Sequence, residues 1–225
     1  MSRPAIFFLL VVAPAFAILL ALLGIETLSS NPVGWFLFLV GVVYAAGLII
    51  VYHIKKERFW ELSSSGAMEQ EERGDWSFWL VSLGMIAVFY LAPLEWLYFN
   101  AILPRASWMS FIGLMLVILG AVLFVWARRR LRSNYSGHIS VKDDQELVQS
   151  GPYRIIRHPA YLGYLLMALG VSLGYSSIMG LSAILLLVPA LVYRIHVEEK
   201  LLEAHFGAQF RTYAEKSARL IPGLW

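Results

Sequence analysis

The stretch GPYRIIRHPAYLGYLL, residues 151–166, brings Arg154, Arg157 and His158 to the start of a strongly apolar segment. The proline at 159 disfavours helical geometry at the preceding residue, so a helix is predicted to begin at Pro159 with His158 as its N-cap. The first turn of such a helix carries unpaired N–H groups and a partial positive charge, which suit an anionic ligand group. With the two arginines beside it, this helix start is predicted to be electropositive.

The composition around this stretch is that of an integral membrane protein. Of the 225 residues, 59% are hydrophobic and 15% are charged, and the mean hydropathy is +0.67. Soluble domains are less apolar than this. The net charge of +3 is too small to indicate a nucleic-acid partner, and the absence of cysteine excludes disulfides, thiolate nucleophiles and Cys-ligated zinc.

The apolar residues occur in blocks of about 20, the length needed to cross about 30 Å of hydrocarbon. We predict six transmembrane helices, at residues 5–23, 34–53, 76–98, 107–127, 159–174 and 177–195. If the N-terminus is cytoplasmic, every one of the 18 Lys and Arg residues except Arg105 falls on the cytoplasmic side. This asymmetry favours six spans with both termini in the cytoplasm.

The last two spans are short, about 24–28 Å at 1.5 Å per residue, and only GYSS separates them. They are predicted to form a tight helical hairpin. The two largest polar segments, 128–158 and 194–225, flank it on the cytoplasmic side. The fold expected is therefore an all-α membrane protein with a cytoplasmic pocket formed by these flanking segments.

The second polar segment contributes Arg194 and Glu198, which are neighbours at i,i+4 on a helix. They lie close to the membrane, where polar side chains are expensive and mark functional sites. The alternative is a surface ion pair worth less than about 1 kcal/mol. That alternative is the default for Glu199, Lys200 and Glu203, whose alternating charges are typical of a solvated face.

No metal site is expected. His196-Val197-Glu198 has the His-x-Glu spacing of zinc deaminases, but no Pro-Cys-x-x-Cys follows, and there is no HExxH. A GxGxxG after a strand is also missing, which excludes a soluble Rossmann-type nucleotide site.

Two segments, ELVQSGPYRIIRHPAYLGYLL (146–166) and RIHVEEKLLEAHFGAQFRTYAEKSARLIPGL (194–224), resemble the superfamily of isoprenylcysteine carboxyl methyltransferases and phospholipid N-methyltransferases. The resemblance covers residues 107–225, the implied catalytic core. Residues 1–106 carry no such motif and would supply transmembrane helices that shape an acceptor tunnel.

The resemblance implies a methyltransferase that uses S-adenosylmethionine (SAM) in a cytoplasmic pocket. The acceptor would be lipophilic or lipidated, would enter from the bilayer, and would most closely match an isoprenylcysteine-type carboxylate. The substrate-binding arginine of the family corresponds to Arg194, which with Glu198 forms the implied catalytic pair. The implied cofactor-binding residues are His138, Gln145, Leu147, Val148, Tyr153, His158, Pro159, Ala160, Tyr161 and Glu198.

Two other functions remain open at this point. The sterol reductases share the C-terminal hairpin architecture but use NADPH, and their motif has an Arg-His-x-Asn-Tyr core where this chain has RHPAY. A non-catalytic transporter or assembly protein is the other. The first four spans carry almost no charge, and they lack the midplane carboxylate or broken-helix pair typical of transporters.

Overall fold

The computed structural model describes residues 31–54, 76–99, 103–131 and 146–225. Its helices are α4 (Pro32–Ile54), α6 (Trp76–Tyr98), α7 (Ser107–Leu131), α8 (Pro159–Gly174), α9 (Ile178–Phe206) and α10 (Ala208–Lys216), with a short 3₁₀ helix, η3 (Gly151–Arg154). The predicted spans at 34–53, 76–98, 107–127 and 159–174 each correspond to a helix, and the span at 177–195 corresponds to the first part of α9. The predicted span at 5–23 lies outside the described residues.

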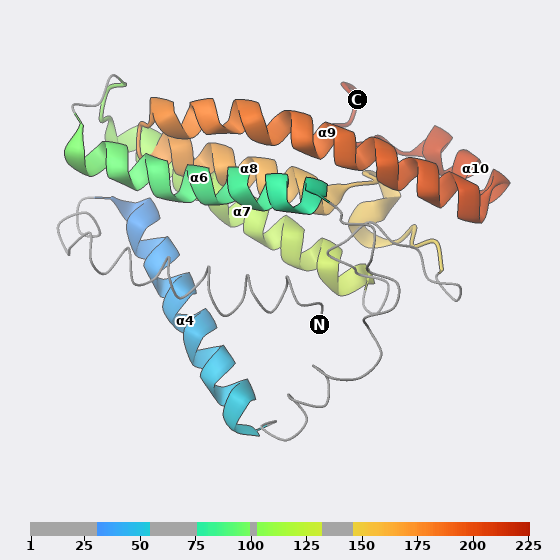
Figure 1. Ribbon diagram of the computed structural model, residues 1–225, viewed down its shortest axis with the longest axis horizontal. Helices are drawn as coiled ribbons and strands as arrows, with labels where there is room; N and C mark the ends of the chain where they lie inside the picture. Colours follow the sequence, from blue (N-terminus) through green and yellow to red (C-terminus); the bar gives the residue numbers. More distant parts are fainter. Residues whose placement is uncertain (1–30, 55–75, 100–102, 132–145) are drawn as a thin grey trace.

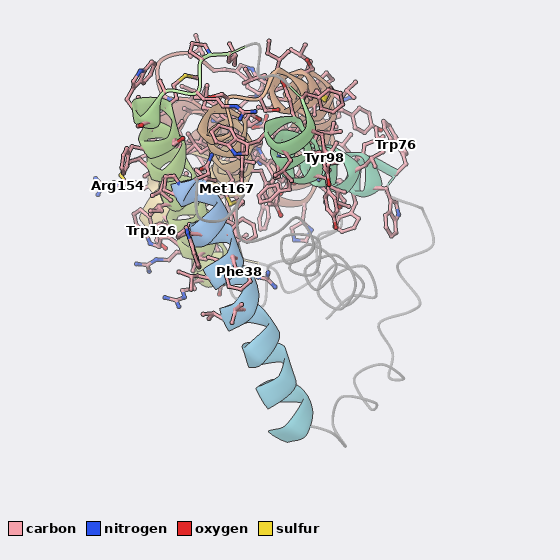
Figure 2. All side chains as sticks on the ribbon, turned by 90° about the vertical axis from the view of Figure 1, so that its left-hand side faces the viewer. Phe38, Trp76, Tyr98, Trp126, Arg154 and Met167 are labelled. Atoms are coloured by element: carbon pink, nitrogen blue, oxygen red, sulfur yellow. The ribbon has the colours of Figure 1, made fainter. Side chains whose placement is uncertain are left out.

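Helices α6 to α9 lie side by side along the long axis of the molecule, and α4 leaves them at an angle (Figure 1). Seen end-on, Trp126 and Arg154 lie on the flank formed by α7, and Trp76 lies on the opposite flank, formed by α6 (Figure 2). α7 packs most closely on α8, and α6 packs most closely on α9. A contact between α8 and α9 joins the two pairs.

Three of the described helices, α6, α7 and α9, are long and apolar enough to cross a membrane. α8 is shorter, at 16 residues. α9, with 29 residues, is about 44 Å long at 1.5 Å per residue. This length exceeds the hydrocarbon thickness of about 30 Å. The helix continues to Phe206, whereas the predicted span ends at residue 195.

The α7–α8 contact is made backbone to backbone through glycines spaced seven residues apart. A Cβ added to Gly113 would lie 2.5 Å from the carbonyl oxygen of Gly170, and one added to Gly120 would lie 2.6 Å from that of Gly163. Small residues at such positions let membrane helices approach closely. The two helices predicted to form a hairpin, α8 and α9, contact each other, but α8 packs more closely on α7, because these glycines face α7.

At the end of the bundle away from the polar segments, a buried carboxylate fixes the start of α9 to α6. Glu95, which is 3% exposed, accepts hydrogen bonds from Ser177 Oγ (2.5 Å) and from the backbone N–H of Met179 (2.8 Å). A negative charge at a helix N-terminus is favourable because the first N–H groups are otherwise unpaired.

The hydrophobic core runs between the α6–α9 pair and the α7–α8 pair. Four of its side chains, one from each helix, are 2% exposed or less: Val88, Val117, Val171 and Leu187. It therefore crosses the predicted boundary near residue 106.

Candidate active site

The segment before α8 is held by the C-terminal segment of the chain. Ile156 and Ala218 form an isolated parallel bridge. The N–H of Arg157 donates to the carbonyl of Ala218 (2.8 Å), and the N–H of His158 donates to the carbonyl of Arg219 (3.0 Å). As predicted, α8 begins at Pro159 with His158 as its N-cap. These backbone bonds fix the direction in which the helix starts.

Three charged side chains, Arg157, Glu199 and Arg219, form what we call the clasp. Arg157 Nε lies 2.7 Å from Glu199 Oε1, and Arg219 Nε lies 2.8 Å from Glu199 Oε2. Arg157 Nη1 also donates to the carbonyls of Ala214 (2.8 Å) and Ser217. The clasp thus ties α9 and the C-terminal segment to the residue before the N-cap of α8.

The clasp corrects two expectations. Glu199 is 8% exposed and does not belong to a solvated face, whereas Lys200 and Glu203 are exposed. The Arg157 side chain is 9% exposed and its charge is balanced by Glu199, so it does not lend free positive charge to the helix start. Arg154 remains exposed. The reason is the fold-back of the C-terminal segment over α9, which helical periodicity alone does not reveal.

A second cluster lies beside the clasp and consists of Arg194, Tyr161 and Glu198, which we call the hydroxyl bridge. Arg194 Nε donates to the Tyr161 hydroxyl (2.9 Å). The same hydroxyl donates to Glu198 Oε2 (2.7 Å). The i,i+4 neighbours predicted from sequence are therefore brought together, and the tyrosine of the His-Pro-x-Tyr motif links them from α8.

His158 lies between the two clusters. Its ring stacks on Tyr161, with centroids 5.5 Å apart and planes inclined by 6°. Nδ1 lies 3.7 Å from Glu198 Oε2, and Nε2 lies 3.4 Å from Glu199 Oε1. Nε2 nevertheless has no hydrogen bond of normal geometry to any described residue, although His158 is 5% exposed. A buried polar atom in this condition is costly and requires an explanation, such as a role in the reaction or a bound group.

The other predicted cofactor residues lie around this centre. Pro159 and Ala160 are the first residues of α8. Leu147 and Val148 are half-buried in the segment that precedes η3. His138 and Gln145 lie outside the described residues.

Tyr153 is buried in η3, and its carbonyl accepts a hydrogen bond from the Tyr213 hydroxyl of α10 (2.7 Å). Burial raises the pKa of Tyr213 to about 12, so this hydroxyl stays protonated and remains a donor at any physiological pH. Thus α10 anchors the turn that carries the Gly-x-Tyr motif. Gly151 opens this turn with φ of 64°, a left-handed conformation that favours glycine.

Two residues of α6 reach the hydroxyl bridge and carried no signal in the sequence. Arg194 Nη1 donates to Ser77 Oγ (3.2 Å), and the Arg194 guanidinium carbon lies 5.9 Å from the centroid of the Phe78 ring. Both residues belong to an apolar span without a motif. Among the described residues, no group of three or more His, Asp or Glu side chains could hold a metal ion.

The chain is similar to several known methyltransferases. The family model of the phospholipid methyltransferases matches residues 108–209. A probable protein-S-isoprenylcysteine O-methyltransferase of Oryza sativa subsp. indica is 29% identical over 143 residues, which are 61% of this chain and 75% of the relative. Protein-S-isoprenylcysteine O-methyltransferase A of Arabidopsis thaliana is 30% identical over 123 residues, 53% of this chain and 62% of the relative.

Among solved structures, the eukaryotic intramembrane Ras methyltransferase ICMT (isoprenylcysteine carboxyl methyltransferase) has a similar fold. The TM-score is 0.61 at 20% sequence identity, and the match covers 96% of this chain and 77% of that chain. The likeness of fold therefore extends well beyond the two motifs, into the half of the chain that carries none. With the family model and the named relatives, the resemblance seen in the motifs is confirmed: the chain is similar to isoprenylcysteine carboxyl methyltransferases and phospholipid methyltransferases.

Proposed function

We propose that this protein is a membrane enzyme that transfers a methyl group from SAM to the carboxylate of an isoprenylcysteine-type acceptor. The observation that carries the proposal is the hydroxyl bridge, in which Tyr161 holds a guanidinium on one side and a carboxylate on the other. The names of the relatives support methyl transfer to a prenylated cysteine.

The residues around His158 fit SAM by the chemistry of their polar groups. SAM offers an ammonium group and ribose hydroxyls, which are donors, and a carboxylate, which is an acceptor. The Glu198 side chain is 35% exposed and can accept from those donors, while the start of α8 suits a carboxylate. His158 Nε2, a buried polar atom without a hydrogen-bond partner among the described residues, can bond to one of the polar groups of SAM. When bound, SAM supplies an electrophilic methyl group on a sulfonium centre.

The role of Arg194 is to orient the acceptor. Its planar guanidinium can hold a carboxylate as a fork, which the ammonium of lysine cannot reproduce. Tyr161 fixes the guanidinium through Nε, and Arg194 is 4% exposed, so its guanidinium is shielded from water. Methyl transfer needs no nucleophile from the protein, so positioning and exclusion of water are its main contributions.

We further propose that the protein crosses the membrane several times, with both termini in the cytoplasm. All the described Lys and Arg residues except Arg105 lie at the end of the bundle that holds the site, the distribution typical of a cytoplasmic face. The chain has no cysteine, so single cysteines report position cleanly. Ser107→Cys should react with an impermeant maleimide only from outside, and Glu203→Cys only from inside. The opposite pattern would overturn this topology.

Cofactor binding tests the proposed site. S-adenosylhomocysteine at 100 times its Kd should stabilise the purified protein by about 2.7 kcal/mol, seen as a raised melting temperature. Glu198→Gln should reduce that shift, because the carboxylate faces the cofactor. Glu203→Gln, on the exposed face of the same helix, is the matched control and should leave the shift unchanged. A shift produced by NADPH in place of S-adenosylhomocysteine would contradict the proposal.

A further inference from the structure

The N-terminal turn of α6 contributes a wall to the site around Arg194. Ser77 has no exposed surface and Arg194 is 4% exposed, so the hydrogen bond from Arg194 Nη1 to Ser77 Oγ (3.2 Å) is shielded from water. The ring of Trp76 packs on that of Tyr193, with centroids 4.7 Å apart. Since Tyr193 precedes Arg194, this ring pair holds the start of α6 against the part of α9 that carries the guanidinium.

The guanidinium is rigid and planar, so two bonds at different nitrogens determine its orientation. One anchor is the Tyr161 hydroxyl on α8, which accepts from Nε (2.9 Å). A second anchor is Ser77 Oγ on α6, which accepts from Nη1. Loss of this bond weakens the restraint on the tilt of the guanidinium plane.

We infer that Ser77 is a positioning residue for methyl transfer, which acts by fixing the plane of the Arg194 guanidinium toward the acceptor carboxylate. The inference rests on the proposed function and adds to it a role for α6, a helix outside the two motifs. The hydroxyl oxygen is the required group, because it accepts the hydrogen bond. Alanine removes that oxygen and threonine retains it.

The contribution of Ser77 should appear in turnover and leave cofactor binding unchanged. Orientation errors of about 1 Å cost up to 10²-fold in rate, and loss of one anchor of the guanidinium should cost less. For Ser77→Ala we expect kcat/KM for an S-farnesylcysteine acid to fall about 10-fold at saturating SAM. The affinity for S-adenosylhomocysteine should stay within twofold of the unaltered protein, because Tyr161 and Glu198 are untouched.

The test uses the full-length protein in detergent or nanodiscs, with two comparison variants. Ser77→Thr should restore at least half of the wild-type kcat/KM. Ser82→Ala removes a hydroxyl from a half-buried position farther along α6, and should leave kcat/KM unchanged. Melting temperatures and S-adenosylhomocysteine affinity are measured for every variant, so that a folding defect is recognised.

Each of the following results would overturn the inference. Ser77→Ala with unchanged kcat/KM, or Ser77→Thr as impaired as Ser77→Ala, would remove the hydroxyl from the mechanism while the proposed function stands. A parallel loss of S-adenosylhomocysteine affinity or of folding in Ser77→Ala would show that Ser77 serves the cofactor site or the fold. Absence of methyl transfer in the unaltered protein would overturn the proposed function, and the role of Ser77 with it.

Discussion

At the scale of single residues, two adjacent glutamates have different roles. Neighbouring positions on a helix point about 100° apart, so Glu198 and Glu199 meet different surroundings. Glu198 meets Tyr161 and is partly exposed, whereas Glu199 is buried between Arg157 and Arg219. We assign Glu198 to ligand binding and Glu199 to structure.

The Tyr161 hydroxyl is predicted to matter for both substrates of the reaction. Tyr161→Phe keeps the ring that stacks on His158 but removes the atom shared by Arg194 and Glu198. We expect turnover to fall by 10-fold or more and the S-adenosylhomocysteine affinity to weaken, because both charged side chains lose an anchor. Steady-state kinetics and titration of the purified variant measure the two effects.

Tyr98→Phe provides the matched control, since Tyr98 is 71% exposed at the opposite end of the bundle. Its kinetics and affinity should equal those of the unaltered protein. Wild-type turnover in Tyr161→Phe would mean that the hydroxyl bridge plays no part in the reaction.

At the scale of structural elements, the C-terminal segment after α10, residues 217–225, packs against the start of α8. The bridge between Ile156 and Ala218 and the clasp both join segments distant in sequence. Arg219 also lies over the ring of Trp225, 5.6 Å from its centroid. This segment holds His158 in place, because the backbone N–H of His158 donates to the carbonyl of Arg219.

The clasp should therefore dominate the stability of this end of the molecule. Glu199→Gln removes the charge that balances Arg157 and Arg219, and loss of one partner of a buried ion pair typically costs 3–5 kcal/mol. We expect the free energy of unfolding to fall by about 3 kcal/mol, measured by denaturation in detergent. Glu203→Gln breaks an exposed pair with Arg211 (3.6 Å) and should change it by less than about 1 kcal/mol. Equal effects from the two substitutions would contradict the assignment of Glu199.

The elements differ in how far the sequence predicts them. The start of α8 at Pro159 follows from local chemistry, since proline restricts the residue before it. The start of α6 at Trp76 follows from an apolar run that begins directly after the charged stretch EERGD (71–75). The close packing of α7 on α8 depends on Gly113, Gly120, Gly163 and Gly170. Each is unremarkable alone, and their meeting requires the three-dimensional register.

At the scale of the whole molecule, the site gathers at one end of a helical bundle. Arg194 and Glu198 come from α9, His158 and Tyr161 from α8, and Ser77 from α6. Spacing and motif indicated the first four. Ser77 could not be predicted, because an isolated serine in an apolar span has no pattern, and its role depends on how α6 packs on α9.

In the proposed function, the two reactants approach the site from different media. α7 and α9 present exposed apolar side chains such as Phe111, Leu119 and Leu185, a surface suited to lipid. α10 lies at the C-terminal end of α9 (Figure 1), and the clasp joins Glu199 of that part of α9 to Arg157 and Arg219. In the proposed function, a lipophilic acceptor reaches Arg194 from the hydrocarbon side and SAM reaches Glu198 from the aqueous side.

Transfer of labelled methyl from SAM to N-acetyl-S-farnesylcysteine by the purified protein tests the proposed function most directly. A carboxyl methyl ester releases labelled methanol in alkali, whereas methyl groups on nitrogen or sulfur are retained. The proposed function predicts that the unaltered protein forms an alkali-labile product. In Arg194→Lys the rate should fall by roughly 10²-fold while the affinity for S-adenosylhomocysteine is preserved, because lysine cannot orient the carboxylate as a fork. Alkali-stable product, or full activity in Arg194→Lys, would contradict it.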